Sequence, residues 1–462
     1  MIRLFKHYIP KSLVVLSLSE LIILFCSMKF AIELRFSENV PSDFLPVLPK
    51  TIAFCFVIYS SMIAMGLYQR HLRDGRRGMF LRIGVAFGIS LVTLSLLFYL
   101  VPFLLFGRGV FALAFGFALA GVIGARLIYI MVVSREDLKR RILVVGVGKK
   151  AHLIESLLKR KSDQRGYKIV GYVPISENEK CEVSEHKVIP HTMTIAHLVE
   201  EHDVDEVVLA VTDRRKGFPV EELLDCKMNG TGVVDIQTFF ERQAGRIILE
   251  LLHPSWLIFS DGFSQGLMRD VVKRLFDILA SSILLMVTFP VMLIAMLCIY
   301  LEDRGPVFYR QVRVGKNWQL VQVIKFRSMR TDAEKEGAPQ WAKANDDRVT
   351  RVGRFIRKTR IDELPQLFNV LRGNMSFVGP RPERPQFVEN FSTNMPFYAE
   401  RHRVKPGITG WAQICYPYGA SEKDTLEKLQ YDLYYVKNYS IFLDLTILFQ
   451  TAEVILWGKG AR

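Results

Sequence analysis

Residues 346–384 read DDRVTRVGRFIRKTRIDELPQLFNVLRGNMSFVGPRPER, a stretch in which an acidic pair lies among many arginines. Asp362 and Glu363 come just before Leu364-Pro365 and an apolar segment. Because proline is tolerated in the first turn of a helix, this order predicts a helix whose N-terminus lies at or next to Asp362. A structural role is one explanation, since Asp is a common N-cap and an acid in the first turn suits the helix dipole.

The arginines around this pair favour chemistry over capping. A carboxylate beside guanidinium groups and a positive helix dipole is expected to stay ionised, and an ionised carboxylate is a competent nucleophile toward phosphorus. An adjacent acid can help to hold Mg²⁺, and the planar forks of arginine bind phosphate oxygens in pairs. We therefore predict phosphate transfer at Asp362 and Glu363. The surrounding basic residues are Arg348, Arg351, Arg354, Arg357, Lys358, Arg360, Arg372 and Arg381.

The composition indicates a chain that is part membrane and part soluble. Half of the 462 residues are hydrophobic and the mean hydropathy is +0.20, yet 23% are charged. The net charge is +15, and residues 304–360 alone hold fifteen Lys or Arg against five Asp or Glu. Such an excess faces anions such as lipid headgroups or phosphorylated substrates; no nucleic-acid-binding motif accompanies it, so we expect no nucleic-acid partner. The six scattered cysteines argue against a disulfide scaffold or a zinc site.

Four apolar runs predict a four-helix transmembrane block over residues 1–138. Each run has roughly the ~20 residues that cross the hydrocarbon of a bilayer. Basic residues before the first run, between the second and third, and after the fourth place both ends of the block in the cytoplasm. Glu20 and Arg126 lie within spans, where facing another helix or snorkelling competes with a functional role. The runs cover residues 13–32, 51–68, 83–106 and 110–133, and the basic residues include Lys6, Arg70, Arg73 and Arg135.

Residues 139–262 alternate strand and helix patterns and predict a Rossmann-like α/β accessory domain. Gly146-x-Gly148-x-x-Ala151 resembles a dinucleotide fingerprint. The second strand, however, ends at Val173 without the acidic residue that would hold a ribose. We therefore interpret the glycines as a tight strand-to-helix turn, and the domain as a sensing, docking or oligomerisation module.

The apolar run 278–301 is long enough to cross a bilayer, but we predict a re-entrant membrane helix over about residues 272–302. Both flanks are basic, and Pro290 lies in the middle, where it breaks or kinks a helix. Residues 441–457 are apolar with interspersed acids, which favours an interfacial amphipathic helix. The sequence thus predicts a multi-domain membrane protein. Its parts are a four-helix transmembrane block, a Rossmann-like α/β domain, and an α-rich catalytic domain (residues 269–462) with a re-entrant membrane helix and interfacial amphipathic helices.

The C-terminal part of the chain resembles the bacterial sugar transferases, the polyprenyl-phosphate hexose-1-phosphate transferases. With its four spans and α/β unit, the chain looks like the long, multi-domain branch, and it is most similar to members associated with exosortase-type exopolysaccharide systems. Two positions depart from the family pattern: Phe289 replaces the serine that often precedes the proline of the membrane helix, and Asp347 replaces a proline in the DPR-type run. The matching stretches are KRLFDILASSILL, GPVFYRQVRVG, VIKFRSMR, DRVTRVGRFIRKTRIDELPQLFNVLRGNMSFVGPRPE, KPGITGWAQI and DLTILFQTAEVILWGKGAR.

The resemblance implies transfer of a sugar 1-phosphate from a nucleotide diphosphate sugar to polyprenyl (undecaprenyl) phosphate, with release of a nucleoside monophosphate. It implies a covalent intermediate on Asp362, with Glu363 helping to bind Mg²⁺. It further implies a bacterial inner-membrane protein whose catalytic domain lies on the cytoplasmic face, and it leaves a homodimer open. Trp411 is expected to contact the donor or the membrane interface. The matched candidates for binding the diphosphate are Lys325, Arg327, Arg354, Arg357 and Arg381.

Two other classes of protein compete with this interpretation. A membrane scaffold or regulator would use the α/β unit to sense a nucleotide and the basic half to hold lipid, but it has no need for two acids among arginines. A membrane-anchored NAD-dependent sugar epimerase or dehydratase would need a ribose-binding acid after Val173 and a Tyr-x-x-x-Lys pair in the α/β unit, and neither is found.

Overall fold

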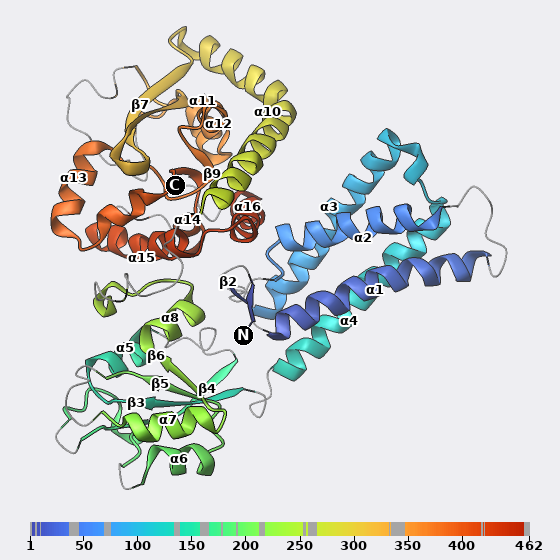
Figure 1. Ribbon diagram of the computed structural model, residues 1–462. Helices are drawn as coiled ribbons and strands as arrows, with labels where there is room; N and C mark the ends of the chain where they lie inside the picture. The colour runs from blue at the N-terminus through green and yellow to red at the C-terminus, as the bar shows by residue number, and fades with distance from the viewer. Residues whose placement is uncertain are drawn as a thin grey trace. The chain divides into compact units, whose positions relative to one another are not determined.

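The structure is a computed structural model, and it divides into two units, mainly Tyr8–Ala244 and Gly245–Arg462 (Figure 1). Each unit is described by itself. Of the residues used above, Lys6, Arg70, Arg73, Arg135 and Asp346 lie outside the described residues. The described residues are 2–4, 7–9, 11–36, 46–68, 75–133, 139–157, 166–176, 179–190, 193–211, 218–252, 256, 266–331, 333, 347–416, 419 and 421–456.

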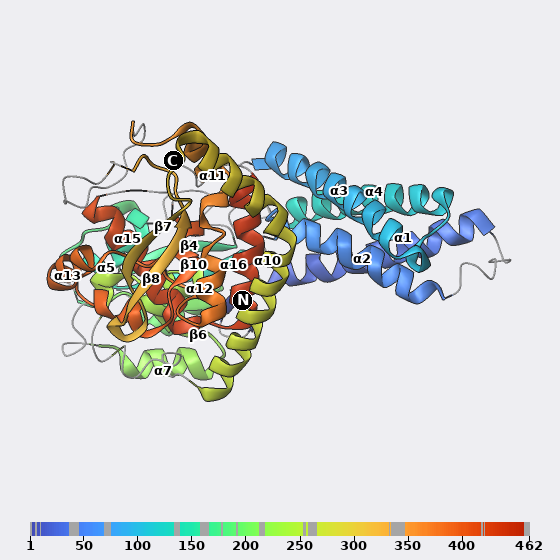
Figure 2. The ribbon, with the colours of Figure 1, turned by 90° about the horizontal axis from the view of Figure 1, so that it is seen from above.

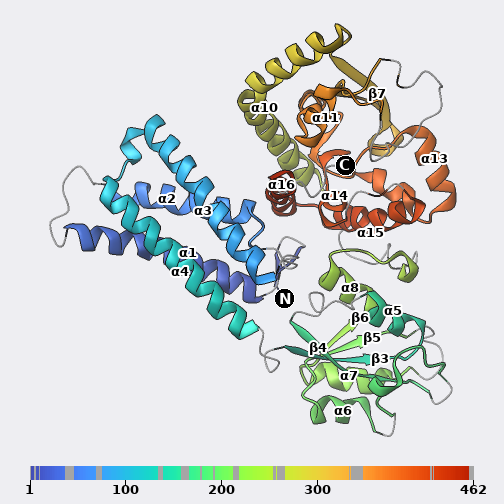
Figure 3. The same cartoon turned by 180° about the vertical axis from the view of Figure 1, so that it is seen from behind.

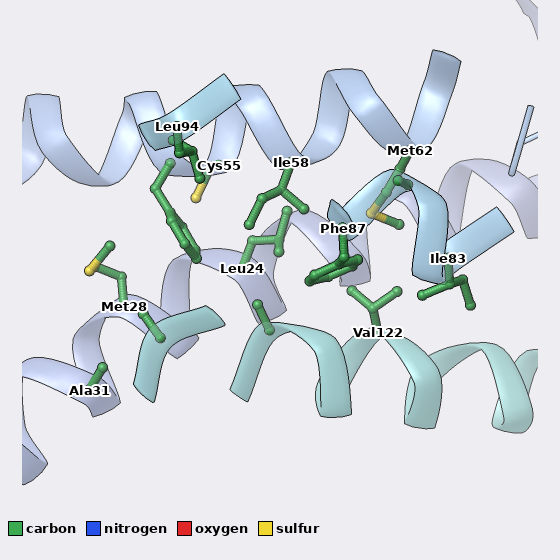
Figure 4. Close-up of a cluster of buried hydrophobic side chains, with 14 of the residues drawn as sticks. Leu24, Met28, Ala31, Cys55, Ile58, Met62, Ile83, Phe87, Leu94 and Val122 are labelled. Atoms are coloured by element: carbon green, nitrogen blue, oxygen red, sulfur yellow. The ribbon is translucent and has the colours of Figure 1, made fainter. Parts of the chain in front are cut away.

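Four long apolar helices form the first part of the N-terminal unit. Their buried side chains meet in one core, in which Leu24, Ile58 and Phe87 are almost completely buried (Figure 4). The third helix ends earlier than the sequence predicted, because Pro102 opens a separate 3₁₀ turn, η2 (Pro102–Leu104). The four helices are α1 (Lys11–Phe36), α2 (Val47–Ala64), α3 (Gly75–Leu100) and α4 (Arg108–Val133), and the short strands β1 (Ile2–Leu4) and β2 (His7–Ile9) precede them.

Within the described residues, five helices are long and apolar enough to cross a membrane: α1 to α4 and α10 of the C-terminal unit (Leu267–Asp303). The chain is therefore a membrane protein. Glu20 and Arg126, the two charged residues singled out within spans, face each other across α1 and α4, with Arg126 Nε 2.7 Å from Glu20 Oε1. The expectation that these residues face another helix is confirmed.

The second part of the N-terminal unit is a four-stranded parallel sheet in the order β4-β3-β5-β6. Helices cover both faces, α5 and α8 one side and α6 and α7 the other, in the arrangement of a Rossmann-like domain (Figures 1 and 3). The strands are β3 (Arg140–Val145), β4 (Tyr167–Val173), β5 (Glu206–Leu209) and β6 (Gly232–Asp235). The helices are α5 (Lys149–Leu157), α6 (Ile195–Glu201), α7 (Val220–Met228) and α8 (Ile236–Ala244).

The glycine loop after β3 makes a tight turn. Gly146 has φ +113°, and a Cβ atom there would lie 2.8 Å from the carbonyl oxygen of Ala210. The amide of Val147, inside the glycine motif, donates to the carboxylate of Glu179 at 3.0 Å, and the amide of Ile175 donates to the same carboxylate at 3.0 Å. The protein's own acid thus takes a backbone donor that a dinucleotide phosphate would otherwise use.

The C-terminal unit is mainly helical, as the sequence predicted. A β-hairpin (β7 with β8, antiparallel) and a short parallel pair (β9 with β10) complete it. After α10, its strands are β7 (Phe308–Val314), β8 (Leu320–Phe326), β9 (Ser376–Val378) and β10 (Gly407–Thr409). Its further helices are α11 (Arg351–Lys358), η7 (Ile361–Glu363), α12 (Gln366–Arg372), α13 (Pro385–Asn394), η8 (Tyr398–Arg403), α14 (Trp411–Cys415), α15 (Glu422–Asn438) and α16 (Ile441–Leu456).

Residues 245–252 belong to this C-terminal unit, although the sequence placed them in the α/β domain. Ile247, Leu249 and Leu252 are buried in the same core as Trp411. The Nε1 of Trp411 donates to the Gly245 carbonyl at 2.8 Å. Trp411 is therefore a core residue, and packing explains its position without a donor contact or a place at the membrane interface.

The long helix α10 continues through Pro290 without interruption, but it changes direction along its length (Figures 1 and 3). The hydroxyl of Thr288, two residues before the proline, donates to the Leu284 carbonyl at 2.7 Å, a bond of the kind that often bends helices. The helix runs along one side of the C-terminal unit (Figure 2). Both of its ends contact other elements of that unit. Arg274 near its start donates to two carbonyls of α12, and Glu302 near its end accepts from the amide of Arg351.

Helix α16 packs into the C-terminal unit with its acid inside. Asp444 is completely buried, with Lys273 Nζ 2.6 Å from its Oδ2 and the Tyr435 hydroxyl 2.7 Å from its Oδ1. From the sequence, the acids of this segment favoured an interfacial amphipathic helix. Asp444 does not contribute to a polar outer face, because a cation and a phenol from other elements bind it within the protein.

Candidate active site

The acidic pair lies in η7, in the turn between α11 and α12. Thr350 caps α11 by accepting from the amide of Gly353 at 2.9 Å. Gly353 allows close approach to the preceding chain, since a Cβ atom there would lie 2.0 Å from the Ser328 carbonyl. Arg360 then adopts a left-handed conformation, φ +60°, which turns the chain into η7. Asp362 and Glu363 are thereby directed inward, and both are buried.

The helix that follows is fixed to the hairpin by one side chain. Asn369 accepts from the amide of Ile324 at 3.1 Å and donates to the carbonyl of Gln322 at 2.7 Å. These bonds hold α12 beside β8, the strand that carries Lys325. The N-cap of α12 is Pro365, with no capping bond from a side chain. Helix capping therefore does not explain Asp362.

Glu363 is the centre of a cluster of cations. Its Oε1 accepts from Lys325 Nζ at 3.1 Å and from Arg381 Nη2 at 2.8 Å, and Arg360 Nη1 lies 3.8 Å away. Burial alone would raise the pKa of Glu363, but the charges of Arg381, Lys325 and Arg360 together lower it well below its ordinary value. Glu363 is therefore ionised at neutral pH.

Asp362 lies beside this cluster without a matching partner. Only 9% of the residue is exposed, and its Oδ1 is buried and accepts no hydrogen bond from the described residues. Burial and the adjacent charge of Glu363 raise the pKa of Asp362 to about 6, although Lys325, Arg360 and Arg381 act to lower it. From the sequence, we expected the arginines to keep this carboxyl ionised. With a pKa of about 6 it is still mainly ionised at neutral pH, but its pKa is raised and not lowered, because burial outweighs the effect of the cations.

Among the described residues, three of the five predicted diphosphate-binding residues form no hydrogen bond or ion pair with Asp362 or Glu363. Arg327 forms a two-pronged ion pair with Asp303 at the end of α10, with Nη1 2.6 Å from Oδ2. Arg354 is exposed and Arg357 half-buried on α11. The structure thus brings together Lys325 and Arg381 with the acidic pair.

Sequence reasoning did not assign roles to several residues that position the site. Arg401 is buried, pairs with Asp432 at 2.8 Å and donates to the Arg381 carbonyl at 2.9 Å, which fixes the backbone of Arg381. Arg274 donates to the last carbonyls of α12. The sequence did contain a signal for the Arg401–Asp432 pair. Asp432 lies in the apolar, aromatic run of α15, where a buried acid without a partner would be costly.

The donor set at this position suits Mg²⁺ in part. Among the described residues, no group of three or more His, Cys, Asp or Glu lies close enough to hold a metal by itself. Mg²⁺ usually takes one or two carboxylates and completes its shell with water and substrate phosphates. The unpaired Oδ1 of Asp362 and the Oε2 of Glu363 fit that pattern, because the closest contacts of all three cations are with Oε1.

Comparison with known proteins identifies two regions of the chain. The model of the family described as bacterial sugar transferase matches residues 268–458, which include the whole site. A model described as CoA-binding domain matches residues 63–216. An exopolysaccharide production protein PSS of Rhizobium leguminosarum is 43% identical over 197 residues, covering 41% of this chain and 98% of that protein.

Longer relatives match in the same region. The UDP-N-acetylgalactosamine-undecaprenyl-phosphate N-acetylgalactosaminephosphotransferase of Aeromonas hydrophila is 42% identical over 278 residues, 59% of this chain and 65% of that protein. The UDP-glucose:undecaprenyl-phosphate glucose-1-phosphate transferase of Klebsiella pneumoniae is 48% identical over 195 residues, 41% of each chain. The matched part thus spans less than two thirds of these longer relatives.

Proposed function

Because the chain belongs to the bacterial sugar transferase family, we propose that it transfers a sugar 1-phosphate from a nucleoside diphosphate sugar to polyprenyl (undecaprenyl) phosphate. The products are a polyprenyl-diphosphate sugar and a nucleoside monophosphate. The reaction starts the assembly of an exopolysaccharide or another lipid-linked glycan. The observation that carries the proposal is the buried, unpaired oxygen of Asp362 beside the cation cluster of Glu363.

The proposed reaction has two displacements at one phosphorus atom. Asp362 attacks the phosphorus that bears the sugar, an O–P bond forms, and the bond to the bridging diphosphate oxygen breaks, so that the nucleoside monophosphate leaves with that electron pair. The phosphate of the polyprenyl acceptor then attacks the same phosphorus, and the Asp362 carboxylate leaves. Lys325 and Arg381 bind the diphosphate oxygens, and Glu363 orients both cations. Mg²⁺, when bound at the two carboxylates, would neutralise diphosphate charge.

The competing functions have less support. In the epimerase or dehydratase alternative the glycine loop would bind a dinucleotide, but Glu179 already accepts from the Val147 amide there. In the scaffold alternative the acidic pair has no task. The α/β domain is proposed as an accessory module, and the assignments to a homodimer and to the exosortase-associated branch stay predictions.

We also propose that α10 is re-entrant and that the C-terminal unit lies on the cytoplasmic face of the inner membrane. A spanning helix has its ends on opposite sides of the bilayer, yet Arg274 and Glu302, 28 positions apart, both bind this one unit. Between them the helix exposes large apolar side chains such as Met286, Phe289 and Leu293. This pattern fits a helix that enters the hydrocarbon and returns.

Cysteine accessibility tests the topology. Single cysteines at Met268 and Arg310, both exposed positions, should be protected from an impermeant maleimide in intact cells, whereas a cysteine at Arg108, the exposed first residue of α4 on the side predicted to face outward, should react. Reaction at position 310 with protection at 268 would establish a spanning helix.

An activity assay tests the reaction. Purified protein with polyprenyl phosphate and each of a panel of nucleotide sugars should release nucleoside monophosphate with one donor or a few. Release of nucleoside diphosphate instead would show transfer of the sugar without its phosphate, and the proposed function would be wrong.

A further inference from the structure

An apolar groove runs between the second half of α10 and α11. Its volume is about 420 Å³, within the range of ligand pockets. Its walls are mainly aliphatic and aromatic, and Arg351 contributes the charged side chain at its edge. The residues that define it are Ile294, Ala295 and Cys298 on α10, Val352 and Phe355 on α11, and Ile361 at the start of η7.

The groove is open to the surroundings of α10. Ile294 is 63% exposed and Phe355 62% exposed, so two large apolar side chains of the walls lack protein cover. The neighbouring α10 residues Leu293 and Leu297 are exposed as well. An exposed apolar surface of this extent marks a contact with lipid or with a partner rather than with water.

The lining of the groove includes the residue that precedes the proposed reactive group. Ile361 lines it, and the next residue is Asp362 with its unpaired oxygen. Basic side chains lie along α11: Arg351 is in the lining, at the start of the helix, and Arg354 follows one turn further on. The surface thus combines an apolar channel with basic side chains on one wall, which complements a long apolar chain that carries a phosphate.

The geometry points to this groove as the site that holds the first isoprene units of the polyprenyl phosphate, with the acceptor phosphate directed toward Asp362. The inference rests on the proposed function and adds the location and chemistry of the acceptor subsite. It also explains why α11 is tied to the end of α10 through Glu302: the two helices that form the walls must keep their spacing.

A groove-filling variant tests this assignment in the full chain. Ile294→Trp should raise the KM for polyprenyl phosphate at least tenfold, while formation of the sugar-phosphate enzyme from the donor alone keeps its rate. Leu293→Trp, on the same helix and outside the groove, should leave both quantities within twofold of the wild type. Equal KM values for the two variants and the wild type would overturn the assignment.

Alkylation of the native Cys298 gives a second measurement. In a variant whose other five cysteines are replaced by alanine, polyprenyl phosphate should slow the reaction of Cys298 with N-ethylmaleimide at least threefold, and an equal amount of phosphatidylglycerol should not. Equal protection by the phospholipid would show a general lipid site and overturn the inference. If the wild type releases no nucleoside monophosphate with any donor and acceptor, the proposed function itself fails, which is a distinct outcome.

Discussion

Two buried acids in this molecule differ in how completely they are paired. Glu20, in the four-helix block, forms an ion pair with Arg126, whose Nε lies 2.7 Å from Oε1 without hydrogen-bond geometry, and its Oε2 accepts from Arg126 Nη2 at 3.1 Å and from the Tyr68 hydroxyl. Asp362, in the C-terminal unit, has an oxygen with no hydrogen bond from the described residues. Both residues are at most 9% exposed.

The difference separates a structural acid from a reactive one. A buried charge that has an ion-pair partner holds elements together, and removal of that partner is costly. A buried carboxylate with an open oxygen is costly in the folded state and is retained where that oxygen has a use. The predictions below alter the pairing at one position or the other.

The largest effect is expected at the reactive acid. Asp362→Asn should reduce turnover by on the order of 10³-fold or more, since the amide cannot act as the nucleophile. Glu363→Gln should also reduce turnover strongly, because Lys325 and Arg381 lose their common acceptor. Released nucleoside monophosphate measures both, and Glu389→Gln, an exposed acid on α13, is the matched control with unchanged turnover. Near-native turnover of Asp362→Asn would exclude the covalent mechanism.

The structural acid should respond in stability. Arg126→Ala leaves Glu20 buried without its counter-charge and should cost about 3–5 kcal/mol in the free energy of unfolding in detergent. Lys29→Ala removes the exposed Lys29–Glu33 pair of α1 (3.7 Å) and should cost less than about 0.5 kcal/mol. Equal losses in the free energy of unfolding for the two variants would show that the buried Glu20–Arg126 pair stabilises the protein no more than an exposed ion pair does.

Asp362→Asn should stabilise the protein while it removes activity. The folded-state pKa of Asp362 is raised to about 6, so its ionisation opposes folding above pH 6, and the penalty disappears as the pH falls toward the unfolded value near 4. We expect a gain of about 2 kcal/mol at pH 7.5 and none at pH 4. Denaturant unfolding at the two pH values measures the difference in the free energy of unfolding. A loss of stability at pH 7.5 would contradict the conclusion that the Oδ1 of Asp362 has no partner.

The pH dependence of the reaction should report the same group. As the pH falls through about 6, Asp362 takes up a proton and loses its nucleophilic form. Formation of the sugar-phosphate enzyme should therefore be about tenfold slower at pH 5 than at pH 8. Glu363, whose pKa is lowered, stays ionised over this range. A rate independent of pH between 5 and 8 would contradict the raised pKa of Asp362.

Local patterns predicted the helices, the sheet strands and the acidic pair, because each is encoded in adjacent residues. Lys325 and Arg381 were also predicted, although 56 positions separate them, because motif matches supplied both. The ion pair of Arg327 with Asp303 was not predicted, because Asp303 lies at the end of α10 and only packing brings the two residues together. The burial of Asp444 and Trp411 was not predicted for a similar reason: their partners, Lys273 and Gly245, are more than 160 positions away. The direction in which the pKa of Asp362 shifts depends on its burial, and counting charges along the sequence does not reveal burial.

The most direct measurement is the mass of the protein after incubation with its nucleotide sugar in the absence of polyprenyl phosphate. The account predicts a mass increase of one sugar phosphate, located by fragmentation on the peptide that contains Asp362, and no increase for Asp362→Asn. An increase that persists in Asp362→Asn, or that maps to another residue, would contradict the claim that this unpaired carboxylate is the nucleophile.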